Sequence, residues 1–138
     1  MKKIQKIIFS SAILCLLFSA SACKKKKDAH VPPDVAFKTG SGYTAGDVTV
    51  TTQDTLKVGI VATKTEDDLK SLNVSYAYDG SSTTTTQNTF YMTASEYEYY
   101  EKDVQIITRN VAGSERWVFS IVDRDGNITQ KTIVLTVQ

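Results

Sequence analysis

The chain has 138 residues, with 16 Lys and Arg against 15 Asp and Glu. This length allows one domain of ordinary size and not two. The charge is unevenly distributed, because from residue 28 onward six Lys and three Arg stand against ten Asp and five Glu, a net charge of −6. A mildly acidic domain repels polyanions, so the composition argues against nucleic acid as a partner.

The first 22 residues have the pattern of an export signal. Three lysines near the start precede an apolar stretch, 7–18, which is too short to span a membrane comfortably. The small residues 19–22 follow, and then Cys23. This order resembles the signal of bacterial lipoproteins, and the resemblance implies that Cys23 becomes the lipidated first residue of the mature chain. Ala20 stands where that family usually has Leu, so cleavage by an ordinary signal peptidase remains the alternative.

The segment after the signal is predicted to be a tether. Residues 24–27 are four consecutive lysines, and Pro32-Pro33 favours an extended backbone. Residues 24–33 would span at most about 33 Å. Beside a lipid, the lysines are better suited to anionic headgroups than to nucleic acid. We therefore expect a signal peptide at 1–22, a lipidated N-terminus and flexible basic tether at 23–33, and one domain at 34–138.

The domain consists of short stretches in which apolar and polar residues alternate, the pattern of strands with one buried face. Strands are expected at 35–37, 47–50, 55–63, 72–78, 81–86 (continued or replaced by 89–93), 104–108, 115–122 and 128–137. Trp117, Phe119 and Ile121 are predicted to face the core, and Asp125-Gly126-Asn127 is a hairpin signal between the last two strands.

Three connections carry further expectations. Residues 40–46 contain three glycines but lack the spacing of a phosphate loop, so we expect a flexible crossing between two half-strands. Residues 65–68 are predicted to form one helical turn with Thr65 as its N-cap. Residues 95–102 interleave Tyr with Glu, which fits either an aromatic ligand platform or a turn whose rings cover the rim of the fold.

Seven or eight short strands with turn residues at each junction predict an all-β, antiparallel sandwich with Greek-key connections. Residues 122–129, with the Ile, Val and Thr alternation that follows, resemble the last hairpin of bacterial immunoglobulin-like and fibronectin III-like modules. The resemblance is specific over about 25 residues and holds only at the level of pattern elsewhere. The resemblance implies a single, non-catalytic immunoglobulin-like domain. The domain departs from antibody domains, because residues 34–138 contain no cysteine pair.

Catalysis finds little support in the residue types. The only histidine, His30, lies in the predicted tether, and Cys23 is assigned to the lipid. No Ser/His or Cys/His pair is therefore expected inside the domain. A glycosidase needs only two carboxylates, but a small sandwich without inserted loops encloses a sugar poorly. We expect that the protein is not an enzyme.

Calcium is the one cofactor that the sequence suggests. Asp123, Asp125 and Asn127 present oxygen side chains at alternate positions, as oxygen-ligand loops do. The expected fold brings the acidic loop with Glu66, Asp67 and Asp68 to the same end. The alternative is an ordinary hairpin turn beside a solvated loop, with no cofactor.

Two functions remain open. One is a membrane-anchored binding or adhesion module of the cell envelope, expected at the outer membrane, for a protein or glycan partner. The other is a structural envelope lipoprotein without a small ligand. In an immunoglobulin-like sandwich the N-terminus shares an end with the loops 64–70, 94–102 and 123–127. A lipid on Cys23 would keep that end near the bilayer. We therefore expect a partner at the opposite end, which carries the loop near 52–54, the turn 79–84 and residues 110–114, or at the strand edge 83–86.

Overall fold

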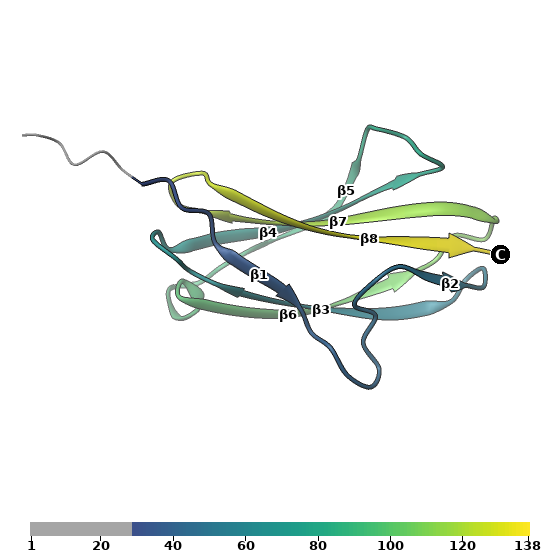
Figure 1. The fold of residues 1–138 in the computed structure, drawn as a ribbon, viewed down its shortest axis with the longest axis horizontal. Helices are drawn as coiled ribbons and strands as arrows, with labels where there is room; N and C mark the ends of the chain where they lie inside the picture. The colour runs from purple at the N-terminus through teal and green to yellow at the C-terminus, as the bar shows by residue number, and fades with distance from the viewer. Residues whose placement is uncertain (1–28) are drawn as a thin grey trace, which may run out of the picture.

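The computed structural model describes residues 29–138. The predicted signal, Cys23 and the lysines at 24–27 lie outside the described residues. Two sheets pack face to face (Figure 1). The first sheet has the order β1 (Asp34–Phe37), β3 (Thr55–Thr63), β6 (Tyr99–Ile107). The second has the order β2 (Val48–Val50), β8 (Ile128–Val137), β7 (Gly113–Asp123), β4 (Leu69–Tyr78), β5 (Thr85–Tyr91). The predicted all-β, immunoglobulin-like sandwich is confirmed.

One strand pair departs from the predicted antiparallel pattern. β2 pairs in parallel with β8, whereas every other pair is antiparallel. The parallel pair arises because the chain leaves β1 in one sheet and crosses over to the edge of the other. Gly40 and Gly42, with φ of 117° and 84°, make this crossing in the left-handed region that glycine tolerates. The crossing predicted for residues 40–46 is therefore present.

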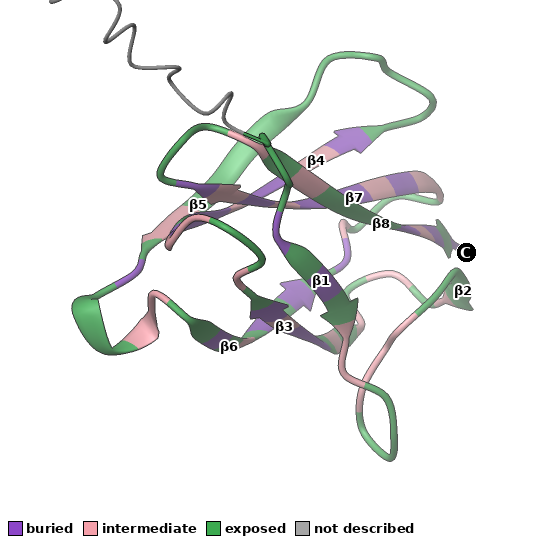
Figure 2. Cartoon of the chain, turned by 60° about the vertical axis from the view of Figure 1, so that its left-hand side comes forward, coloured by how far each residue is buried: buried purple, intermediate pink, exposed green. Residues whose placement is uncertain are grey.

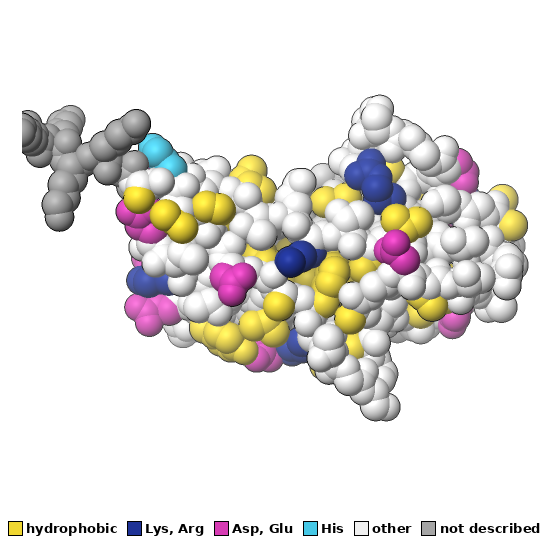
Figure 3. All heavy atoms as spheres, in the orientation of Figure 1, with side chains coloured by type: hydrophobic (Ala, Val, Ile, Leu, Met, Phe, Trp, Pro, Cys, Tyr) yellow, Lys and Arg dark blue, Asp and Glu magenta, His cyan; other side chains and the backbone are white. Residues whose placement is uncertain are grey.

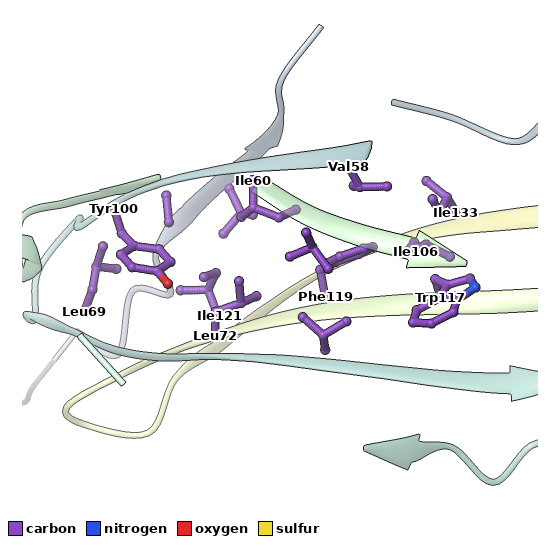
Figure 4. Close-up of a cluster of buried hydrophobic side chains, with 14 of the residues drawn as sticks. Val58, Ile60, Leu69, Leu72, Tyr100, Ile106, Trp117, Phe119, Ile121 and Ile133 are labelled. Carbon is purple, nitrogen blue, oxygen red and sulfur yellow. The ribbon is translucent and has the colours of Figure 1, made fainter. Parts of the chain in front are cut away.

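The core lies between the sheets and confirms the period-two reading. Trp117, Phe119 and Ile121 of β7 are all buried. Phe37 of β1 meets the ring of Phe119 edge-on at 5.6 Å between centroids, so the short edge strand is tied to the centre of the core. Figure 4 shows labelled side chains from both sheets pointing into the space between them.

Three local predictions are wrong in detail. Residues 65–68 form bends and no helix, because the Thr65 hydroxyl donates to the carbonyl oxygens of Val31 and Pro32, both at 2.9 Å, in place of capping a turn. β5 begins at Thr85, since residues 81–84 belong to a projecting turn. The strand predicted from residue 104 begins earlier, because β6 already starts at Tyr99, shortly after a 3-10 turn at Ala94–Glu96.

The last residues of the predicted tether lie against the domain. The Thr129 hydroxyl donates to the carbonyl oxygen of Pro33 at 2.6 Å, and the Val31 amide donates to Glu66 at 3.3 Å. His30 Nδ1 is 2.9 Å from the carboxylate of Asp125. These contacts hold residues 30–33 at the end of the sandwich that carries the β3–β4, β5–β6 and β7–β8 connections (Figure 1). Within residues 29–138, no helix is long and apolar enough to cross a membrane.

Candidate functional site

The structure brings the two predicted calcium loops to one end, but their oxygens serve other contacts. Asp123 is buried, and its two carboxylate oxygens accept hydrogen bonds from the backbone amide and the side-chain amide of Asn127, at 2.8 and 3.0 Å. These bonds close the hairpin as an Asx-type turn does. The side chains of Asp123 and Asn127 therefore have a structural role in the hairpin turn, as the alternative to calcium binding predicted.

The remaining predicted ligands are distributed around this end. Asp68 pairs with Lys64 at 3.1 Å, Asp125 pairs with His30, and Glu66 accepts from a backbone amide. Asp67 lies in the same loop as Glu66 and Asp68. Across residues 29–138 there is no group of three or more His, Cys, Asp or Glu side chains placed to hold a metal ion. Calcium binding stays a prediction of the sequence.

A groove opens beside the same end, at the edge of the five-stranded sheet. It encloses about 370 Å³ and is lined by Lys70, Tyr91, Met92, Tyr97 and Arg124. We call it the tyrosine groove. Its residues come from the start of β4, the end of β5, the β5–β6 connection and the β7–β8 hairpin. Four segments far apart in the sequence therefore build one concave surface.

Lys70 reaches the groove through a β-bulge. Leu69 pairs with Asp123 and Ser71 pairs with Val122, so Lys70 is an extra residue with no counterpart on β7. Bulges commonly redirect a side chain at the edge of a sheet. Lys70 is exposed, and its ammonium makes no ion pair or hydrogen bond with any residue of 29–138.

Backbone hydrogen bonds hold the walls of the groove in place. The amide of Met92 donates to the carbonyl of Lys70 at 3.0 Å, and the amide of Leu69 donates to the carbonyl of Tyr97 at 2.8 Å. On the hairpin side, the amide of Arg124 donates to the carbonyl of Asp68 at 2.9 Å. A groove fixed in this way is formed before a ligand arrives, which reduces the entropy lost on binding.

The 3-10 turn beside Tyr97 has its own support. The carboxylate of Glu96 accepts from the backbone amide of Thr93 at 2.8 Å and from its hydroxyl at 2.7 Å. These two bonds, the backbone bond first, lower the pKa of Glu96 below its usual value. The turn therefore keeps its geometry, and with it the position of the Tyr97 ring, at neutral pH.

The side chains of the groove combine aromatic faces with positive charge. The guanidinium of Arg124 lies 4.0 Å from the centre of the Tyr97 ring, a cation–π contact. Its Nε is 4.0 Å from a carboxylate oxygen of Asp68, so its charge is only partly compensated. Tyr91 is 75% exposed, the largest exposed fraction among the large hydrophobic and aromatic residues of the part of the chain that the structure describes. Such a ring contributes little to the fold.

The structure bears on one of the two interpretations of residues 95–102. Tyr100 is buried in the core and covers the rim, as one reading predicted. Tyr97 lines the groove, and a role for its ring as a ligand platform stays a prediction. No local pattern in the sequence marks Lys70, Tyr91 or Arg124, because the bulge and the hairpin that bring them together leave no signal in periodicity.

The predicted docking edge at 83–86 is poorly suited to adding a strand. β5 and the turn before it are exposed (Figure 2), but the pairing of β4 with β5 shifts register between Val74 and Ser75. The amide of Thr89 is already engaged by the side chain of Asn88 at 2.8 Å. A bulge and a side chain that caps an edge amide are devices that discourage strand addition.

The charges at the opposite end of the sandwich bind one another. Arg109 makes a two-pronged ion pair with Asp79, and Asp79 also accepts from the amide of Ser114 at 3.0 Å. The Arg109 contact, followed by the Ser114 bond, lowers the pKa of Asp79 to about 2. The Arg109 guanidinium stacks 4.7 Å from the centre of the Tyr78 ring. The charged groups of this network are therefore committed to the fold.

A second cavity, of about 320 Å³, lies on the outer face of the three-stranded sheet near Gly42, Lys57 and Asp103. Its charged groups are engaged as well, since Asp103 accepts from the Tyr43 hydroxyl at 2.9 Å and from Lys38 at 3.1 Å, and the Lys57 ammonium lies 4.3 Å from the centre of the Tyr43 ring. On the face that carries β1 and β8, acidic and basic side chains are scattered, with no patch of one sign (Figure 3). The tyrosine groove differs from that cavity, because Lys70 makes neither an ion pair nor a contact with an aromatic ring among residues 29–138.

No protein-family model matches the chain, and no curated protein matches it. Among solved structures, murine CRIg is similar with a TM-score of 0.41 and 16% identity, over 78% of this chain and 99% of that chain. The likeness is distant, and the assignment of the fold rests on the strand order.

Proposed function

We propose that the protein is a non-catalytic binding module of the bacterial cell envelope, anchored by a lipid on Cys23, and that it recognises a protein or glycan partner through the tyrosine groove. One observation carries this proposal. The groove combines the 75% exposed ring of Tyr91 with Lys70, whose ammonium makes no ion pair and no aromatic contact among residues 29–138, whereas the charged groups of the second cavity and of the Arg109–Asp79 network are engaged within the domain.

The composition of the groove supports a role in recognition. Tyrosine and arginine are enriched among the residues that dominate binding energy at interfaces. Exposed tyrosine offers a large rigid face at a low cost in side-chain entropy. Because the backbone bonds described above fix the walls, a ligand would not need to order them first.

A lipid anchor on Cys23 would limit the distance between the tyrosine groove and the membrane. The seven Cα–Cα steps from Cys23 to His30 span at most about 25 Å, and residues 30–33 lie against the end of the sandwich beside the groove. With a lipid on Cys23, the groove would stay close to the membrane surface. The proposal therefore has recognition at the anchored end, in contrast to the opposite end that the sequence suggested.

Site-specific photo-crosslinking in intact cells tests the proposal. A photoreactive amino acid would replace Tyr91, and separately Thr132, which is exposed on β8, and Ser82 in the projecting turn. The proposal predicts an adduct from position 91 that disappears when Lys70→Ala is added, and none from position 132. An adduct from position 82 alone would mean that the partner binds at the opposite end of the sandwich, away from the anchor. If no position gives an adduct, the alternative of a purely structural lipoprotein would be favoured.

A further inference from the structure

We infer that the ligand of the tyrosine groove is an acidic carbohydrate, a glycan containing uronic-acid units whose ring packs on the tyrosines and whose carboxylate meets Lys70 and Arg124. This inference rests on the proposed function and narrows it to one class of ligand. It follows from three properties of the groove, which are its rings, its charge and its size.

The two tyrosine rings provide the apolar part of the site. A sugar ring has one or two faces made mainly of C–H groups, and such a face packs well against an aromatic ring whose face carries partial negative charge. Tyr91 is largely exposed, so a ligand could cover its ring without displacing protein. One face of the Tyr97 ring is covered by the Arg124 guanidinium. We therefore expect Tyr97 to contribute less than Tyr91 to packing against the sugar.

The charges provide the selectivity. The five lining residues include two cations and no acid, although the chain from residue 28 onward carries a net charge of −6. Lys70 has no counter-ion among residues 29–138. Arg124 uses only its Nε towards Asp68, so the rest of its guanidinium can donate two parallel hydrogen bonds to a carboxylate.

The size and surroundings fit one sugar unit within a longer chain. A cavity of about 370 Å³ lies near the lower end of the range for small-ligand sites. Tyr91 pairs with Ser71, and the next outward pair along these strands is Asn73 with Thr89. Neighbouring sugar units would therefore lie over small polar side chains that can bond to hydroxyl groups.

Titration calorimetry on the full mature chain in detergent tests the inference. The probes are oligogalacturonate, oligoglucuronate and oligomannuronate, each beside the same oligosaccharide with its carboxyl groups reduced to alcohols. At least one acidic oligosaccharide should bind about tenfold or more tightly than its reduced form, the factor expected for a charge-assisted hydrogen bond. Its affinity should fall as salt is raised.

Variants connect that binding to the groove. Lys70→Ala should lower the affinity by about tenfold and reduce the preference for the acidic form, and Tyr91→Ala should weaken both forms. Lys131→Ala, which removes an exposed lysine on β8, is the matched control and should leave the affinity unchanged. An equal loss from Lys70→Ala and Lys131→Ala would mean non-specific charge attraction and would overturn the inference.

The remaining outcomes separate the inference from the proposed function. If reduced and acidic forms bind equally, the ligand class is wrong while the groove remains a glycan site. If no oligosaccharide binds but position 91 still crosslinks to a protein, the inference fails and the proposed function stands with a protein partner. If no oligosaccharide binds and position 91 gives no adduct, both are wrong.

Discussion

The indole Nε1 of Trp117 donates a hydrogen bond to Oε2 of Glu115 at 3.0 Å, and both side chains are buried on the inner face of β7. The other carboxylate oxygen of Glu115 accepts from the backbone amide of Arg109 at 2.8 Å. The fully buried carboxylate of Glu115 thus accepts the hydrogen bond of the indole N–H and also bonds the connection between β6 and β7 to the core. Buried polar groups of this kind stabilise a fold only while every partner is present.

Replacing Glu115 with Gln should destabilise the domain. A glutamine offers one oxygen and one NH₂ group, so it must point a donor at either Trp117 Nε1 or the Arg109 amide. The unsatisfied contact should cost about 1–3 kcal/mol in the free energy of unfolding, measured by urea denaturation. Glu98→Gln is the control, because the Glu98 side chain is 82% exposed, and it should change stability by less than about 0.5 kcal/mol. Equal losses would contradict the role of Glu115.

Truncation of Trp117 tests the packing of the sandwich. Trp117→Ala should cost about 3–5 kcal/mol, as large-to-small changes in cores do, and thermal unfolding would report it. Arg116 points away from the core and contacts the carbonyl of Ser81 at 3.1 Å, so Arg116→Ala should cost about 1 kcal/mol or less. If the two variants lost the same stability, the assignment of inner and outer faces on β7 would be wrong.

The ion pair of Asp79 with Arg109 should make the stability of the domain depend on pH in the acid range. Its pKa is about 2 in the folded protein, below the ordinary value of 3.8. Ionised Asp79 therefore stabilises the fold above about pH 4, and this contribution is lost as the pH falls towards 2. Asp79→Asn keeps a residue that tolerates the positive φ of 50° at this position. The melting temperature of the variant should lie below that of the parent at pH 6, and the gap should close at pH 2. A gap that stays constant would contradict the ion pair.

The lipid anchor makes a prediction of its own. Cys23→Ser should release the protein from the membrane fraction and prevent incorporation of labelled fatty acid, because stable anchoring depends on the acyl chains. If Cys23→Ser still sediments with membranes and the parent never takes up label, the lipoprotein proposal fails. Lysines 24–27 alone would give only a weak attraction, one that salt removes.

The fold could be predicted from the sequence because each long strand has one buried face. The alternation around Trp117, Phe119 and Ile121, and the glycines near residues 40–46, are local signals of a strand and of a crossing. Thr65 was misread because its hydroxyl bonds to residues 31 and 32, more than thirty positions away. Contacts at that separation have no counterpart in local propensity.

Most of the candidate site could not be predicted, because its residues are brought together by contacts between segments far apart in the sequence. Tyr97 lay in a stretch that the sequence had marked as a ligand platform or a rim. Lys70 reaches the groove only because a bulge removes it from the strand pattern, and Arg124 arrives on a hairpin more than fifty residues later. A bulge of one residue changes which face a side chain occupies, and nothing in the residue types predicts where it falls.

The measurement that tests the central claim most directly is a two-dimensional amide NMR spectrum of the mature chain, titrated with the acidic oligosaccharide panel. The groove account predicts that the largest shift changes fall on the amides of Lys70, Met92, Tyr97 and Arg124, and that Lys70→Ala removes them. Shift changes centred on the turn 79–84, or spread evenly over the surface, would contradict binding at the tyrosine groove.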